Sequence, residues 1–292
     1  MKLTIGMATY DDYDGVYFTV QAIRMYHPEV TAETEILVVD NHPDGPCATA
    51  LKALETHVSG YRYIANGEKE GTSQPRNKVF SEAQNDYVLC TDSHVLLCPG
   101  ALRKLIDYFT FHPDTNDLLQ GPLIYDNLKR FSTHFKPEWF QGMYGVWKDD
   151  DERANDPNGQ PFEIPMQGLG IFACRKDAWL GFNTEFRGFG GEEGYIHEKF
   201  RQAGYRTLCL PFLRWAHRFD RPCGVKYPLA WEDRIRNYWI GHLELGLDTT
   251  DLDTHFQDFL GKEAYRGIME NVILPIVKSY MTKPKASVIY IY

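Results

Sequence analysis

Apolar runs alternate with amphipathic segments through the N-terminal part of the chain. Segments with helical spacing separate four runs, which read LTIGMATY, TEILVVDN, YRYIANG and DYVLCTDSHVLL. Continuous apolar runs are typical of strands that are buried on both sides, and strands that alternate with helices form parallel sheets. The pattern therefore predicts an α/β fold in which helices cover both faces of a mostly parallel sheet.

Polar side chains occur where three of these predicted strands end. They are Tyr10-Asp11, Asp40-Asn41 and the pair Asp92 and His94. Ligands of open α/β sheets bind beyond the carboxyl ends of the strands. We therefore expect the three groups to converge on one crevice.

Asp92 and His94 interrupt the last apolar run, with Ser93 between them. Residues two apart at a strand end point the same way, so their side chains can meet one cation. Burying both groups without partners would be costly. One interpretation is a turn that Asp92 caps; the other is a metal site.

The second half of the chain is less regular. The stretch 129–161 mixes aromatic and turn residues without clear periodicity, so we expect a functional loop or lid there. Helical spacing resumes in EEGYIHEKFRQAG and again from Trp231 onward.

Composition narrows the class of protein. The 292 residues carry a formal net charge of −9, which argues against a general polyanion binder. Six cysteines without a C-x-x-C pair fit a reducing compartment. We find no signal-like segment and no apolar run of membrane-spanning length, and therefore predict a cytoplasmic protein without a membrane span.

The order ATYD, VVDN, RN and D-x-H resembles the nucleotide-binding half of GT-A fold glycosyltransferases. The stretch Gly188–Phe219 is similar to the motif region of the polypeptide N-acetylgalactosaminyltransferases, with an aromatic-G-G-E element and then R-x-x-H-x-F. The resemblance implies a Rossmann-like GT-A domain over 1–225, with a nucleotide-binding half at 1–100 and a half for donor sugar and acceptor at 101–225. A helical extension, 226–292, would pack on it.

The resemblance also implies a metal-dependent transfer of sugar from a nucleotide-sugar, most readily a UDP-sugar. Asp92 and His94 would bind the cation together with His217, the histidine of R-x-x-H-x-F. A mixed carboxylate and imidazole set suits Mn²⁺ better than Mg²⁺. The alternative for His217 is a structural histidine packed beside Trp215.

Donor-binding positions follow from strand ends, helix starts and glycines. Thr9 and Tyr10 would meet the base, Asp40 the base or ribose, and Ser93 the donor beside the cation. Arg76 and Asn77 begin a helix where phosphate is favoured. Simpler roles are a turn cap for Asp40 and a surface ion pair for Arg76. Two glycines would admit the donor sugar or form a strand bulge: Gly168 and Gly170.

Glu192 and Glu193 follow two glycines at a predicted helix start, where acidic residues are favourable in any case. The resemblance gives Glu192 a contact with the donor sugar and implies a retaining mechanism, which we expect here. The chain departs from that family at Glu193 and Tyr195. Either glutamate could therefore serve instead as the base of an inverting transferase.

The acceptor hydroxyl could belong to a glycan, a protein or a hydroxymethylated pyrimidine of phage-type DNA. DNA would require a basic groove with stacking aromatics. Candidates are the segment NLKR at 127–130, Lys136, Arg218, Arg221, Lys226, Arg234 and Arg236, with Trp139, Phe140, Tyr144 and Trp147. A non-catalytic nucleotide- or glycan-binding module on the same scaffold is a further alternative.

Overall fold

The computed structural model describes residues 3–67, 71–149, 151–220 and 224–282. Its main sheet has the strand order β10-β12-β6-β11-β4-β1-β2-β3. Four parallel neighbours form the N-terminal half of this sheet: β1 (Leu3–Thr9), β2 (Thr34–Asp40), β3 (Tyr61–Ala65) and β4 (Tyr87–Asp92). The register pairs Thr9 with Asp40 and Ala8 with Asp92, so the polar strand ends lie at one edge.

The other half of the main sheet makes it mixed. Strand β11 is antiparallel to both β4 and β6, while β12 is parallel to β6 and antiparallel to β10. These strands are β6 (Leu118–Gln120), β10 (Phe162–Glu163), β11 (Ile171–Arg175) and β12 (Thr207–Cys209). The predicted α/β class with a mixed, mostly parallel sheet is confirmed.

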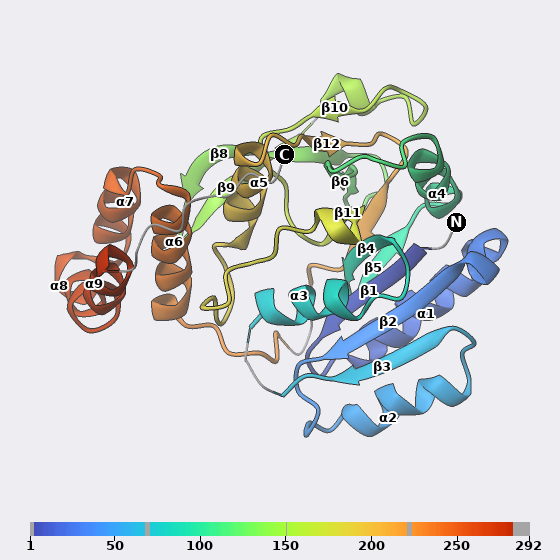
Figure 1. Ribbon diagram of the computed structural model, residues 1–292, viewed down its shortest axis with the longest axis horizontal. Helices are drawn as coiled ribbons and strands as arrows, with labels where there is room; N and C mark the ends of the chain where they lie inside the picture. Colours follow the sequence, from blue (N-terminus) through green and yellow to red (C-terminus); the bar gives the residue numbers. More distant parts are fainter. Residues whose placement is uncertain (1–2, 68–70, 150, 221–223, 283–292) are drawn as a thin grey trace.

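Helices cover both faces of the sheet (Figure 1) because successive strand residues point to opposite sides. Ile36 and Val38 face a core shared with α1, α2 and α4, whereas Leu37 and Val39 face a core shared with α3 and α5. The helices are α1 (Tyr13–Tyr26), α2 (Ala48–Ala53), α3 (Ser73–Glu82), α4 (Ala101–Phe111) and α5 (Glu192–Gln202). Short 3-10 turns occupy Pro28–Glu33, Leu54–Thr56, Glu152–Ala154 and Lys176–Ala178.

A second sheet, with the order β5-β13-β7-β8-β9, lies beside the end of β4. Its strands are β5 (Val95–Leu97), β7 (Leu123–Ile124), β8 (Phe131–Phe140), β9 (Met143–Asp149) and β13 (Trp215–His217). The interpretation of 129–161 as an irregular loop was therefore wrong over the β8–β9 hairpin. Register shifts within that hairpin hide the alternation that would identify its strands.

The C-terminal helices gather at one side of the molecule (Figure 1). They are α6 (Trp231–Leu245), α7 (Thr250–Leu260), α8 (Lys262–Ile268) and α9 (Leu274–Thr282), with a π-turn at Met269–Ile273. Their apolar cluster takes in Trp139 and Tyr144 of the hairpin. These two aromatic rings, predicted as stacking residues, are instead used in packing. No helix in the described part of the chain is long and apolar enough to cross a membrane.

Candidate active site

A cavity of about 400 Å³ lies at the carboxyl ends of β1 and β4. The start of α3, the loop before α5 and the segment before α6 complete its walls. Six of the residues predicted to bind the donor or the cation line it: Thr9, Tyr10, Arg76, Asp92, Ser93 and His94. The expected convergence of strand ends on one crevice is thus present.

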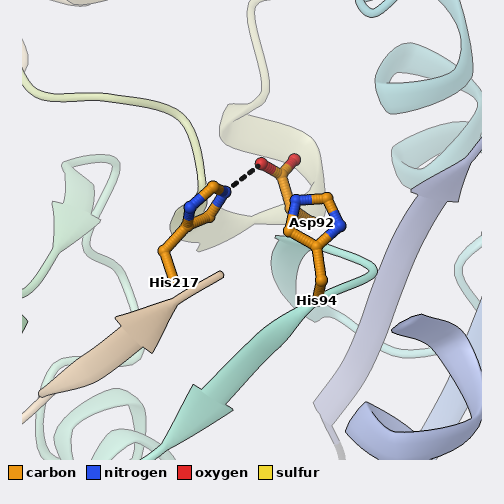
Figure 2. A group of neighbouring side chains, drawn as sticks. All are labelled: Asp92, His94 and His217. Carbon is orange, nitrogen blue, oxygen red and sulfur yellow. Dashed lines mark ion pairs between the residues drawn. The ribbon is translucent and has the colours of Figure 1, made fainter. Parts of the chain in front are cut away.

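Asp92, His94 and His217 lie together beside this cavity, with one ligand atom from each within 4.8 Å of the others. Asp92 ends β4, and His94 lies in the turn that leads to β5. Strand β13 pairs antiparallel with β5 and sets His217 opposite Val95, which brings the second histidine to the same place (Figure 2). The three side chains therefore come from two different sheets.

The geometry of this group fits a divalent cation. Adjacent ligands about 2.1 Å from one ion stand roughly 3 Å apart, and Nε2 of His217 is 3.4 Å from Oδ2 of Asp92. Nδ1 of His217 is buried and has no hydrogen-bond partner within the described structure. The set is one carboxylate and two imidazoles, which agrees with a transition-metal preference.

Arg76 holds the other oxygen of Asp92. Its Nη2 donates to Oδ1 over 2.9 Å, and only 7% of the residue is exposed. Burial alone would raise the pKa of Asp92, but the charge of Arg76 and the hydrogen bond with His217 outweigh it and hold that pKa well below its usual range. Asp92 is therefore ionised and can offer Oδ2 to a cation.

Asp12, which sequence reasoning did not assign, lies behind His94. Its Oδ2 is 2.9 Å from His94 Nδ1 and 3.1 Å from Ser93 Oγ. Burial would raise the pKa of Asp12, but the hydrogen bond with His94 and the charge of Arg218 hold it well below its usual range. Asp12 is also the N-cap of α1, since Oδ1 accepts from Gly15 N over 3.2 Å.

The region expected to bind the nucleotide base is only partly open to the cavity. The Tyr10 ring lines the cavity but stacks on His42, with centroids 4.7 Å apart. Asp40 is fully buried, and its carboxylate accepts from Tyr63 OH and from His42 N. Burial raises the pKa of Asp40. Asp40 therefore supports the strand-end turn, while the neighbouring Asn41 reaches the cavity wall.

Three further residues that were predicted to contact the nucleotide-sugar donor do not line the cavity. The carboxamide of Asn77 is engaged by Phe182 and by the Trp179 indole. A Cβ at Gly168 would lie 3.0 Å from Trp147, and one at Gly170 would lie 2.5 Å from Trp215. These glycines allow close packing against two tryptophan rings, and their proposed contact with the donor sugar stays a prediction.

Glu192 and Glu193 begin α5 after Gly190 and Gly191, whose φ values of 102° and 94° favour glycine. Glu192 is 1% exposed and accepts from the Thr72 hydroxyl, itself a cavity residue. Oε2 of Glu193 is buried and has no partner among the described residues. Burial, and then the charge of Glu192, raise the pKa of Glu193 to about 7.

The sequence pattern of the family described as Glycosyl transferase family 2 matches residues 4–178, more than half of the chain. The chain belongs to this family. The predicted glycosyltransferase class is thereby confirmed. The dolichol-phosphate mannosyltransferase of Saccharomyces cerevisiae is 23% identical in an alignment of 167 positions, which covers 51% of this chain and 62% of that protein.

Solved structures share the fold of this family 2 chain. GalNAc-T7 with UDP, GalNAc and Mn²⁺ superposes with a TM-score of 0.62 at 16% identity, over 98% of this chain and 59% of that one. The mannosyltransferase PcManGT of Pyrobaculum calidifontis, with GDP-Man and Mn²⁺, gives 0.52 at 15%, over 96% and 74%. Staphylococcus aureus TarS 1–349 with UDP-GlcNAc gives 0.52 at 16%, over 96% and 79%.

These likenesses confirm the GT-A fold. The chain spans less than two thirds of the length of both the yeast enzyme and GalNAc-T7. Membership of the polypeptide N-acetylgalactosaminyltransferases stays a resemblance, and the cytoplasmic location and the domain boundary at 225 stay predictions.

Two aromatic cavity residues of the family 2 chain were absent from the sequence-based set. Phe189 and Tyr227 pack ring against ring, with centroids 5.8 Å apart, and both line the cavity. Arg218 pairs with Asp12 at 3.1 Å, and Lys226 donates to the Asp11 carbonyl at 2.7 Å. Both cations were predicted only as parts of a DNA-binding groove, and the position of Arg218 directly after His217 was the signal for a role at this cavity.

Proposed function

We propose that this chain transfers a sugar from a nucleotide-sugar, expected to be a UDP-sugar, to an acceptor hydroxyl in a reaction that requires a divalent cation, expected to be Mn²⁺. Asp92, His94 and His217 would hold the cation. The observation that carries the proposal is their convergence within 4.8 Å beside a cavity of about 400 Å³. The Mn²⁺ and nucleotide present in the GalNAc-T7 and PcManGT structures support it.

The bound cation would neutralise charge on the leaving diphosphate. Arg76 keeps Asp92 ionised and adds positive charge at the cavity wall. Thr72, just before α3, also lines the wall, and a helix N-terminus favours the negative charge of phosphate. Together these groups would orient the donor with its diphosphate toward the metal group.

We further propose Glu193 as the general base that takes the proton of the acceptor hydroxyl. A base works best with a pKa near the operating pH, and the pKa of Glu193 is raised to about 7. Its Oε2 is buried without a hydrogen-bond partner in the described structure, and Glu193 does not line the cavity, so the assignment requires the acceptor hydroxyl to reach the start of α5 beyond the cavity wall. This assignment implies inversion at the anomeric carbon.

Retention, which the resemblance favoured, would use Glu192 to bind the donor sugar. In the structure Glu192 is 1% exposed and its carboxylate is engaged by Thr72 and Ser73. We therefore assign Glu192 to holding the start of α3 against the start of α5. The anomeric configuration of the product, read by NMR, decides between the two, and a retained configuration would exclude Glu193 as the base.

The acceptor is better matched by a glycan or protein hydroxyl than by DNA. Arg218 pairs with Asp12, the Arg234 guanidinium stacks on Trp231, and Arg236 turns toward Glu185. These cations therefore do not form a continuous groove over the described surface. Arg221 lies outside the described residues. Trp147 packs on Phe135, which leaves Phe140 as the exposed member of the four predicted stacking aromatics.

Calorimetric titration with UDP tests the proposal. We expect binding in Mn²⁺ and none in chelator, and His217→Ala should lose the Mn²⁺-dependent binding and the transfer activity. His112→Ala is a matched control, because His112 is an exposed residue at the end of α4, where its ring contacts Tyr108 and does not line the cavity. Equal UDP affinity in chelator and in Mn²⁺ would overturn the role of the metal.

A further inference from the structure

We propose that Asp12 is a positioning residue that fixes the tautomer and orientation of His94 for cation binding. The inference rests on the proposed metal group and concerns a side chain outside that group. Asp12 caps the N-terminus of α1, whereas the candidate ligands come from the end of β4, from the turn after it and from β13. Its contribution is therefore separable from that of the ligands.

The contact between Asp12 and His94 determines which imidazole nitrogen faces the cation. A carboxylate can only accept, so with Oδ2 at 2.9 Å the Nδ1 of His94 must carry a proton and donate it. In the neutral ring Nε2 is then the unprotonated nitrogen. Figure 2 shows that one ring nitrogen of His94 lies on the side of Asp92 and the other points away from it.

The Asp12 carboxylate is itself held in place by several contacts. Oδ1 accepts from Gly15 N at the start of α1, and Oδ2 also accepts from the Ser93 hydroxyl. Arg218 donates to the same carboxylate at 3.1 Å, and it directly follows the candidate ligand His217. Asp12 thus connects the immediate surroundings of both histidines.

The first turns of α1 lie tightly on the turn that contains His94. A Cβ at Gly15 would come within 2.2 Å of Asp12 Oδ2 and 2.8 Å of the Ser93 carbonyl oxygen. The Thr19 hydroxyl donates to the carbonyls of Ser93 and Val95, at 3.0 and 3.1 Å. The helix and the turn therefore form one rigid unit, and Asp12 approaches His94 in a fixed geometry.

The Asp12→Asn variant removes the orienting charge and keeps the helix cap. Asparagine caps helices as well as aspartate does, so the fold should survive. Its amide can present N–H to Nδ1, which leaves the proton on Nε2 and blocks that nitrogen as a ligand. The control is Asp248→Asn, because Asp248 likewise accepts from a backbone N–H, that of Thr250 at the start of α7, away from the cavity.

The probe is Mn²⁺ alone, followed by electron paramagnetic resonance on the full chain. Loss of a residue that orients a ligand typically costs about 10–100-fold in metal affinity, and we expect a loss of this size in Asp12→Asn and none in Asp248→Asn. Pulsed measurements should detect two imidazole nitrogens on Mn²⁺ in the wild type and one in Asp12→Asn. A change confined to stability would leave these nitrogen couplings intact.

The outcomes separate this inference from the proposed function. Wild-type affinity and two nitrogen couplings in Asp12→Asn would overturn the positioning role and leave the metal site standing. Absence of any nitrogen coupling in the wild type would remove the metal site and the role of Asp12 with it. Thermal unfolding without metal should give similar midpoints for Asp12→Asn and the wild type, and a collapsed midpoint would show that Asp12 acts on the fold instead.

Discussion

Arg76, which is buried, forms an ion pair with the partly buried Asp92, with Nη2 and Oδ1 2.9 Å apart. The two carboxylate oxygens of Asp92 have different contacts. Oδ1 accepts a hydrogen bond from the guanidinium of Arg76, while Oδ2 faces His217. Asp92 is thus both a candidate metal ligand and the counter-ion of Arg76, whose side chain is almost fully buried.

Removing Asp92 should therefore affect stability as well as transfer. Asp92→Asn leaves the Arg76 charge unpaired, and breaking a buried pair typically costs about 3–5 kcal/mol. We expect a loss of this order in the free energy of unfolding, measured by urea denaturation without metal. The paired change Arg76→Met with Asp92→Leu removes both charges and should cost less.

The matched control for this prediction is Glu198→Gln. Glu198 pairs with Arg201 on the outer side of α5, where both side chains are partly in water. Exposed pairs contribute at most about 1 kcal/mol, so this change should be small. Equal losses in Asp92→Asn and in the double variant would contradict the unpaired-charge explanation.

Activity should rise with pH through about 7 if Glu193 is the base, since only its ionised form can take a proton. Glu193→Gln should lower the transfer rate by about 10²–10⁴-fold and abolish this rise. The measurement is a profile of kcat/KM against pH for the wild type and the variant. A more acidic acceptor should recover part of the lost rate.

Glu192→Gln distinguishes the two carboxylates. It removes the neighbouring charge that helps to raise the pKa of Glu193, so the rise in activity should move to lower pH. It also loses the charge that binds the Thr72 hydroxyl, and we expect weaker activity that high pH does not restore. Recovery of Glu192→Gln at high pH would instead make Glu192 the base.

Glu193 should also make stability depend on pH. Its pKa is raised to about 7 from an ordinary value of 4.5, so the folded chain binds more protons than the unfolded chain between these values. The stabilisation is present below the lower value and is lost as pH rises through the higher one. Urea unfolding across this range should show a smaller decline for Glu193→Gln than for the wild type.

Gly170→Ala should disturb the packing that supports the metal group. The added Cβ would lie 2.5 Å from the Trp215 ring and 3.5 Å from Cδ2 of His217. Overpacking of this kind typically costs about 1–3 kcal/mol, and Mn²⁺ affinity should fall with it. Gly168→Ala meets its neighbours at 3.0 Å and should be milder. Unchanged tryptophan fluorescence and Mn²⁺ affinity in Gly170→Ala would show that Trp215 can move aside.

The ends of the parallel strands could be predicted because periodicity locates them directly. Thr9, Asp40 and Asp92 follow apolar runs, and they do lie at one edge of the sheet. The approach of His217 to Asp92 and His94 could be expected only from the spacing of a known motif. Its physical cause is the pairing of β13 with β5, which no local pattern encodes.

The roles of other residues could be recognised only from the three-dimensional structure. Arg76 and Asn77 are neighbours at a helix start, but successive helix residues point about 100° apart, and Asn77 therefore turns to Phe182 while Arg76 reaches the cavity. From the sequence alone, Asp12 would be predicted only as a helix N-cap. Its second role depends on the distance to His94, a residue far along the chain.

The pairing of β5 with β13 has a consequence for how the chain folds. It joins segments that are distant in sequence, and the entropy of closing such a loop makes contacts of this kind slow to form. A cation that needs both His94 and His217 would bind only chains that have completed this step, and by mass action it would favour them over partly folded ones. During refolding, the rate at which Mn²⁺ binding appears would therefore report how fast the second sheet forms.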